Sequence, residues 1–305
     1  MTSTIALAGA TGNLGLRIAK ALRQQDAEVW ALVRPETGDD DKLAALIESR
    51  CTVVKVDLAN PEQLQAALKG ADVVISALQG LRDVIVGTQT DLLNAAVAVG
   101  VRRFIPSDYA ADFTKTEDEP NRNFDMRREF GTVLDAAPIE AVSVLNGMFM
   151  DLLAYGMPLF DLRKHSVTYW GEPNQLLDLT TMDDTAFVTA LAALDPQAPR
   201  YVRVAGDQIS AAGLAALGGE LTGTPFQLVR AGNIAELSQA IEKTRAADPG
   251  GEGEEFPRWQ QMQYTRNMMS GKAKLDPVDN ARFPTIAWTS VRDLATGMLA
   301  HQGGG

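Results

Sequence analysis

Residues 4–15 read Thr4-Ile5-Ala6-Leu7-Ala8-Gly9-Ala10-Thr11-Gly12-Asn13-Leu14-Gly15, an apolar run that leads straight into three glycines spaced by three. A helical pattern over residues 16–23 follows. Strand, glycine turn and helix in this order form the layout that binds a dinucleotide pyrophosphate. One glycine allows the tight turn, one lets the backbone approach the phosphates, and one lets the helix pack close to the strand. An ordinary turn could also require glycines, but the position between a strand and a helix favours the phosphate-binding interpretation.

The start of the predicted helix supplies the chemistry for holding an anion. The first N–H groups of a helix have no partner within it, and the helix dipole places partial positive charge beside them. We therefore predict that the turn and the first helical residues bind the phosphates of a cofactor. These residues are Gly9, Thr11, Gly12, Asn13, Leu14 and Gly15.

The composition argues against several classes of protein. The chain has 305 residues, 46% of them apolar and 22% charged, and a net charge of −11, which is unsuited to binding nucleic acid. Cys51 is the sole cysteine and there are two histidines, so we expect neither an intramolecular disulfide nor a metal site. No apolar run is long enough to cross a membrane, and the early first strand leaves no room for a signal peptide. We therefore expect a cytoplasmic protein that binds no membrane.

Predicted strands and helices alternate along the first half of the chain. Short runs rich in β-branched residues predict strands at 28–33, 52–56, 72–77, 103–106 and 141–145. Helical patterns lie between them at 43–48, 61–68, 89–99 and 123–137, and Asn60 is the predicted N-cap of the second. This alternation predicts an α/β fold with a doubly wound parallel sheet of Rossmann type, covered by helices on both faces.

The pattern loosens in the second half of the chain, after Asn146. Strands at 166–170, 176–180 and 202–205 mix with helices at 183–194, 210–221 and 234–246, and with a helix around 262–269. We predict a dinucleotide-binding domain over residues 1–150, with segments around 176–205 returning to its sheet. The remainder of 151–305 is predicted to form mostly a smaller substrate-binding lobe.

The end of the second predicted strand selects between the two nicotinamide cofactors. An NAD site usually has a carboxylate there, and an NADP site has an arginine for the 2′-phosphate. This strand ends without a carboxylate, and Arg34 follows it with planar donors suited to a phosphate. We predict NADP(H) as the cofactor, with a solvated loop arginine as the alternative. Asp57, after the third strand, either faces the adenine or caps the turn before Pro61, and the sequence does not separate these two roles.

Ligands of doubly wound sheets bind outside the carboxyl ends of the strands. Segments 76–79, 107–109 and 146–149 follow three of the predicted strands and therefore lie at that edge. The predicted cofactor contacts among them are Ala77, Leu78, Gln79, Ser107 and Asn146. Apolar residues nearby suit a flat aromatic substrate, although such residues are often simply core. The predicted substrate contacts are Phe149, Met150 and Tyr155.

Arg127 is the charged residue predicted to act in catalysis. None of the five tyrosines is followed by lysine four positions later, so the Tyr-x-x-x-Lys pair common in reductases of this build is absent. The apolar stripe of helix 123–137 extends back to Arg127, which therefore points inward, while Arg128 is rotated away. An inward arginine needs a partner, which is a cofactor ribose, a substrate oxygen, or a carboxylate such as Asp125 or Asp151. Arginine is a poor proton donor, but it stabilises developing negative charge.

Other polar residues have weaker claims to a role. Tyr109 either donates a proton from just beyond the fifth strand or packs under the loop as an aromatic ring. Lys115 lies in a charged loop and is expected to be solvated, and His165 is expected to be a surface or packing residue. Asp183 and Asp184 suit the first turn of a helix, where negative charge is favoured by the helix dipole.

The chain resembles the NmrA-like and isoflavone-reductase-like branch of the short-chain dehydrogenase/reductase superfamily. The resemblance rests on segments 9–15, 32–34, 103–109 and 146–149, and the third of these is similar to the family's Phe-x-Pro-Ser-Glu-Phe motif. It implies a Rossmann-type NADPH domain and a small C-terminal substrate lobe. Catalytic members of the family reduce phenolic or aromatic compounds and use a lysine on the helix after strand five. Arg127 stands at the position of that lysine.

These observations lead to two hypotheses of function. In the first, the protein is an NADPH-dependent reductase of a small apolar, aromatic or quinone-like substrate. Hydride leaves the nicotinamide, Arg127 stabilises the oxyanion, and water or Tyr109 supplies the proton. The second is implied by the resemblance, because NmrA-like regulators bind the cofactor without reductase chemistry and act as redox sensors through a protein partner. The arginine at the lysine position favours this alternative, and the oligomeric state stays open.

Overall fold

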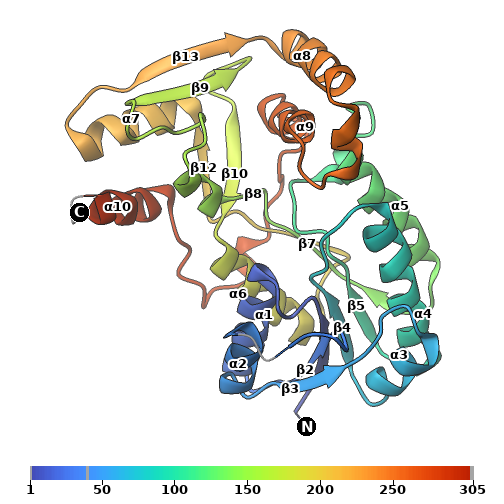
Figure 1. Ribbon diagram of the computed structural model, residues 1–305. Helices are drawn as coiled ribbons and strands as arrows, with labels where there is room; N and C mark the ends of the chain where they lie inside the picture. The colour runs from blue at the N-terminus through green and yellow to red at the C-terminus, as the bar shows by residue number, and fades with distance from the viewer. Residues whose placement is uncertain (1, 39–40, 303–305) are drawn as a thin grey trace. The chain divides into compact units, whose positions relative to one another are not determined.

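The structure is a computed structural model that describes residues 2–38 and 41–302 (Figure 1). The chain forms two compact units. The first comprises Met1–Tyr109, Phe124–Val144 and Thr185–Val202. The second comprises Ala110–Asn123, Leu145–Asp184 and Arg203–Gly305. Each unit is therefore built from segments that are far apart in the sequence.

A six-stranded sheet forms the centre of the first unit. Its strands are β1 (Thr4–Ala8), β2 (Glu28–Val33), β3 (Thr52–Lys55), β4 (Val73–Ser76), β5 (Arg103–Ile105) and β6 (Glu140–Ala141). They lie in the order β3-β2-β1-β4-β5-β6, and every neighbouring pair is parallel. The order reverses between β1 and β4, which is the switch point where ligands of such sheets bind. The predicted doubly wound parallel sheet is confirmed.

Helices cover both faces of this sheet (Figure 1), and the first five of them connect its parallel strands in turn. They are α1 (Asn13–Gln24), α2 (Asp41–Glu48), α3 (Pro61–Leu68), α4 (Gln89–Ala98), α5 (Arg122–Ala136) and α6 (Met182–Leu194). The face covered by α3, α4 and α5 holds a continuous apolar core, in which the rings of Phe104 on β5 and Phe130 on α5 lie 5.9 Å apart. Asn60 caps α3 as predicted, because its side chain accepts the Gln63 N–H at 3.0 Å.

The structure corrects two of the predicted strands. The single strand expected at 141–145 is divided into β6 and β7 (Ser143–Leu145), because the chain changes partners at Val142. The Val142 N–H still donates to Phe104, which lies on β5, whereas the Ser143 N–H donates to Arg200. The strand expected at 202–205 is β11 (Tyr201–Arg203), and it pairs with β7 rather than with the six-stranded sheet.

Two small sheets and four helices make up most of the second unit. One sheet has the order β12-β10-β8, formed by β12 (Asp207–Ser210), β10 (Leu176–Thr180) and β8 (Met148–Phe149). The other pairs β9 (Ser166–Trp170) with β13 (Gln227–Gly232). The helices are α7 (Ala211–Thr222), α8 (Ile234–Ala247), α9 (Arg258–Met269) and α10 (Val291–Gln302). β8, β12, β13 and α10 were not predicted; β8 has two residues, and β13 is almost entirely exposed and so lacks the alternating burial that marks a strand.

Candidate functional site

The glycine turn lies at the carboxyl end of β1 in the first unit. Gly9 has φ +78°, and a Cβ added there would lie 2.5 Å from the carbonyl oxygen of Ala77. Both observations require glycine, because an L-residue is strained at this φ and the space is filled by backbone. The Gly12 N–H donates to the Gly9 carbonyl at 3.0 Å and closes the turn. The predicted tight turn off the strand is therefore present.

Gly15 allows helix α1 to pack directly on this turn. A Cβ at Gly15 would lie 2.1 Å from the carbonyl oxygen of Gly9, which is far closer than any real contact. Gly12 is the N-cap residue of α1; it makes no side-chain cap hydrogen bond, and the first turn of α1 contains no acidic residue. The start of the helix thus presents N–H groups and partial positive charge without a carboxylate to neutralise them. This geometry suits a phosphate.

Arg34 and Asp57 lie after the two neighbouring strands β2 and β3. The Arg34 side chain is 78% exposed and makes a 3.5 Å ion pair with Glu36, itself an exposed residue, so the guanidinium is available to a ligand. Asp57 accepts the Ala59 N–H at 2.9 Å through its carboxylate, and its own N–H donates to the Gln63 side chain. These hydrogen bonds are consistent with the role in the turn before α3, which is one of the two roles open to Asp57.

Ser107 joins the segments that follow β4 and β5. Its hydroxyl donates to the Leu78 carbonyl at 2.7 Å, and its N–H donates to the side-chain oxygen of Gln89 at 2.9 Å. Gln89 is fully buried, and its amide also donates to the carbonyl of Ile85 at 2.6 Å. A π-helix over Asp83–Thr88 leads into this residue. Sequence reasoning missed Gln89, although a glutamine inside an apolar helical pattern is a signal for such a buried link.

Asp108 is a buried carboxyl group beside Ser107. The Ser143 hydroxyl donates to it at 2.6 Å, and Arg200 donates to the same hydroxyl at 2.6 Å. Burial raises the pKa of Asp108, and the hydrogen bond from Ser143 together with the positive charges of Arg127 and Arg200 only partly opposes the rise. Sequence reasoning placed Asp108 at the strand end without assigning it a role.

Arg127 is half-buried on α5, and its positive charge acts on Asp108. Arg128 is directed elsewhere, as predicted, and forms an ion pair with Asp125. Asp151, the other predicted carboxylate, accepts the Met182 N–H at 2.8 Å within the second unit. The structure therefore shows an electrostatic interaction between Arg127 and Asp108. The sequence had not indicated this interaction.

Tyr109 is buried, with 7% of its surface exposed. Burial raises the pKa of its phenol well above the ordinary value for tyrosine. The phenol is therefore a weaker acid than a solvated one. This environment matches an aromatic ring that packs beneath the loop, which was one of the two predicted roles.

The predicted residues of the second unit differ in their environments. Asn146 is fully buried, its backbone N–H donates to Ala110 at 2.9 Å, and neither polar atom of its amide has a partner within the part of the chain that the structure describes. Phe149 is half-buried at the end of β8, Met150 is fully buried in the core, and Tyr155 is 77% exposed. An unsatisfied buried amide is uncommon and calls for a partner.

The remaining predictions concern residues outside these groups. Lys115 is exposed, as expected, with 39% of its side chain accessible, and its ammonium also donates to the carbonyls of Lys274 and Asp276 at 3.1 and 2.8 Å. His165 packs edge-on against a phenylalanine ring, as one predicted role requires. Asp183 and Asp184 lie in the first turn of α6, as predicted.

Within residues 2–38 and 41–302, no group of three or more histidine, cysteine, aspartate or glutamate side chains could hold a metal ion. Among the helices of the same residues, none has the length and apolar character needed to cross a bilayer.

A model of the NmrA-like family matches residues 1–265. The chain belongs to the NmrA-like family. A bifunctional pinoresinol-lariciresinol reductase of Linum usitatissimum is 30% identical over 203 residues, and that match covers 63% of this chain and 65% of the relative, just under two thirds of its length. An isoflavone reductase homolog of Zea mays is 29% identical over 259 residues, covering 79% of this chain and 81% of the relative.

Solved structures of similar proteins share the fold. AtPrR2 with NADP+ and (+)pinoresinol has a TM-score of 0.78 at 23% identity, with 98% of this chain and 99% of that chain covered. An isoflavone reductase has a TM-score of 0.81 at 18% identity, with 97% and 99% covered. A leucoanthocyanidin reductase–NADPH complex from Vitis vinifera has a TM-score of 0.80 at 16% identity, with 98% and 100% covered. The likeness extends over nearly the whole of each chain.

Proposed function

We propose that this member of the NmrA-like family is an NADPH-dependent reductase of a small apolar substrate that is aromatic or quinone-like. The observation that carries the proposal is the close packing of Gly9, Gly12 and Gly15 at the end of β1, beside an uncapped helix start. The relatives named above support it, because they are reductases and two of the solved neighbours hold NADP+ or NADPH. The proposed activity and substrate class therefore rest on the geometry of the site and on the similarity to these reductases.

The first unit supplies most of the proposed cofactor contacts. The backbone from Gly9 to Gly15 holds the pyrophosphate through N–H groups, and Arg34 holds the 2′-phosphate through a charged, bidentate hydrogen bond. Ala77, Leu78 and Gln79 line the cofactor after β4, and Ser107 fixes this segment through its bond to the Leu78 carbonyl. We propose that the unsatisfied amide of Asn146 forms hydrogen bonds with the cofactor. Asp57 supports the site indirectly, because its carboxylate fixes the turn after β3.

Bound NADPH would supply a hydride to the electrophilic carbon of the substrate. As the hydride adds to a carbonyl carbon, the oxygen gains negative charge, which Arg127 stabilises because its guanidinium stays charged. The oxygen then takes a proton, with water as the source that we favour over Tyr109, since burial raises the pKa of that phenol. The substrate itself is held by apolar residues of the second unit, for which we propose Phe149, Met150 and Tyr155.

The alternative is an NADP(H) sensor that acts through a protein partner. The family resemblance favours it, because that resemblance implies that Arg127 stands where catalytic members have a lysine able to exchange a proton. A sensor requires different affinities for the reduced and oxidised cofactor and a partner whose binding depends on that difference. It requires no turnover.

The first experiment is calorimetry with NADPH, NADH and NADP+. Arg34→Ala should weaken NADPH binding about 10- to 100-fold and NADH binding little, since a hydrogen bond between charged groups contributes about 1.5–3 kcal/mol. Arg230→Ala, on the exposed strand β13, is the control and should leave both affinities unchanged. Equal weakening of NADPH and NADH by Arg34→Ala would show that Arg34 does not bind the 2′-phosphate.

The second experiment separates the reductase from the sensor. Oxidation of bound NADPH is followed in a single turnover against a panel of quinones, aromatic ketones and aromatic aldehydes. Acceleration by any of these compounds supports the reductase, and Arg127→Met should then slow the step. No acceleration, together with a partner that binds only one redox state, would favour the sensor.

A further inference from the structure

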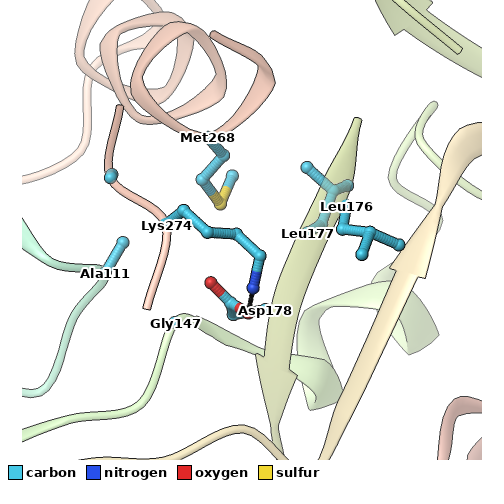
Figure 2. Close-up of a pocket in the computed structure, with 8 residues that line it drawn as sticks. Ala111, Gly147, Leu176, Leu177, Asp178, Met268 and Lys274 are labelled. Atoms are coloured by element: carbon cyan, nitrogen blue, oxygen red, sulfur yellow. Dashed lines mark hydrogen bonds and ion pairs between the residues drawn. The ribbon is translucent and has the colours of Figure 1, made fainter. Parts of the chain in front are cut away.

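A small cavity in the second unit lies outside the sites predicted from the sequence. Its volume is about 10 Å³, and its lining includes Leu176, Leu177, Asp178, Met268 and Lys274. Figure 2 shows the Lys274 side chain extending past Met268 toward Asp178. A space of this size holds one atom group about as large as a water molecule. A ligand can therefore place a single oxygen in it while the rest of the molecule stays outside.

Asp178 is a buried carboxylate whose acceptors are well occupied. Its side chain is 4% exposed and forms an ion pair with Lys274. It also accepts the Leu275 N–H at 2.7 Å and the side-chain amide of Gln208 at 2.6 Å. Three donors on one buried carboxylate satisfy its acceptors and fix its position. Asp178 thus serves as an anchor for the ammonium group beside it.

Lys274 has hydrogen-bonding capacity beyond this anchor. An ammonium group carries three donors, and in residues 2–38 and 41–302 its Nζ is hydrogen-bonded to Asp178 alone. The Lys274 side chain is 21% exposed and lines the cavity. Because the ion pair restrains the side chain, its remaining donors are held in place before a ligand arrives.

Apolar side chains and backbone lie around the ion pair of Lys274 and Asp178. Leu177 and Met268 form walls of the cavity, and Leu176 leaves 44% of its surface exposed at the rim. Gly147 brings backbone against Asp178, since a Cβ there would lie 2.2 Å from the Asp178 carbonyl oxygen. Next to it in the chain is Asn146, whose buried amide has no partner in the described residues. A fixed cationic donor in a space of this size suits one oxygen atom of a ligand whose aromatic ring stays outside the cavity.

We propose that this cavity receives a free phenolic oxygen of an aromatic ligand and that Lys274 donates a hydrogen bond to it. The inference rests on the proposed function, because it assigns the subsite that recognises the substrate of that reaction. Two properties select the phenol. The ammonium favours an oxygen with partial or full negative charge, and the small volume rejects the additional methyl group of a methyl ether.

The test compares two ligands that differ by one methyl group. Binding of 4-hydroxyacetophenone and 4-methoxyacetophenone to the full chain is measured by calorimetry, with and without NADP+. The wild-type protein should bind the phenol about tenfold more tightly than the ether, and Lys274→Met should reduce this preference to less than about twofold. Lys272→Met is the matched control, since Lys272 lies two residues away and pairs with Asp118 instead, and it should keep the preference.

A double variant controls for the possibility that Lys274→Met fails to fold. Lys274→Met leaves the buried Asp178 without its cation, so the double variant Lys274→Met/Asp178→Asn removes both charges together. It should lose the phenol preference while retaining the circular dichroism spectrum of the wild type. A wild-type protein with no preference, or a double variant that keeps the preference, would overturn the proposal. The NADPH affinity and turnover of the same samples report separately on the proposed function, so its failure is distinguishable from that of the phenol subsite.

Discussion

Replacing Gly15 with alanine tests whether the glycine turn is as tightly packed as the structure shows. The new methyl group would lie 2.1 Å from the carbonyl oxygen of Gly9, 2.8 Å from its carbonyl carbon and 3.0 Å from the Cα of Ala10. All three are backbone atoms, so no side-chain rotation relieves the contact. Helix α1 must move away from the turn, and its N–H groups must move with it.

The expected change in the free energy of unfolding combines two opposing effects of the new methyl group. Glycine to alanine in a helix interior normally stabilises by about 0.5–1 kcal/mol, whereas forcing a methyl group into a filled space costs about 1–3 kcal/mol. We therefore expect Gly15→Ala to lower the free energy of unfolding by about 1–2 kcal/mol. Gly131 on α5 provides the control, because a Cβ there meets nothing within 4 Å. Gly131→Ala should gain about 0.5–1 kcal/mol.

The assay is urea unfolding of both variants, followed by calorimetry with NADPH. The displaced helix start should also reduce NADPH affinity at least about tenfold in Gly15→Ala, and Gly131→Ala should bind as the wild type does. If Gly15→Ala were as stable as Gly131→Ala and bound NADPH equally well, the close approach of α1 to the turn would not be what holds the phosphate.

Two further predictions concern buried charge in the first unit. Arg103 is 1% exposed and donates to the half-exposed Glu140 and to the carbonyls of Ala192, Ala193 and Asp195. Arg103→Met should cost about 1–3 kcal/mol in urea unfolding, because it leaves buried carbonyl groups without their donor. Arg102→Met, which removes an exposed partner of the same glutamate, should cost less than about 1 kcal/mol, and equal losses in the two variants would contradict this reasoning. Because burial raises the pKa of Asp108 in the folded protein, its ionisation destabilises the fold progressively as pH rises above the ordinary value of 3.8. The free energy of unfolding gained by Asp108→Asn should therefore be small near pH 4 and increase toward pH 8. A gain that decreases with rising pH would show that ionisation of Asp108 does not destabilise the folded protein.

The sequence predicted those parts of the fold whose signals are local. The glycine turn needs only residues 9–15, and the cap of α3 needs only Asn60 and the residues that follow it. The parallel sheet follows from alternating runs of strand and helix patterns. Strand β7 was assigned to the wrong sheet because its change of partner depends on Arg200, which lies 57 residues away from Ser143. No local pattern carries that information.

The same limit applies to the candidate site. Periodicity placed Arg127 on the inner side of α5, but it could not name the carboxyl group on which Arg127 acts. The influence of Asp108 follows only from its burial and from its hydrogen bond with Ser143, which lies 35 residues further along the chain. Likewise, the pairing of Asp178 with Lys274 spans 96 residues. Polar networks of this kind form between elements that only the folded chain brings together.

If Arg127 acts on the substrate as we propose, the electrostatic influence between Arg127 and Asp108 gives the site a different dependence on pH from one built around lysine. An arginine keeps its charge throughout the range in which proteins are folded, so Arg127 neither gives nor takes a proton. Any change of charge between these two groups must therefore come from Asp108. If Arg127 stabilises an oxyanion as we propose, it does so more strongly when Asp108 is protonated, because the negative charge of Asp108 is then absent. When Asp108 ionises, that field is partly cancelled. Under the proposed function, the contact to the oxyanion would thus take its pH dependence from a buried carboxyl group and not from the contacting residue itself.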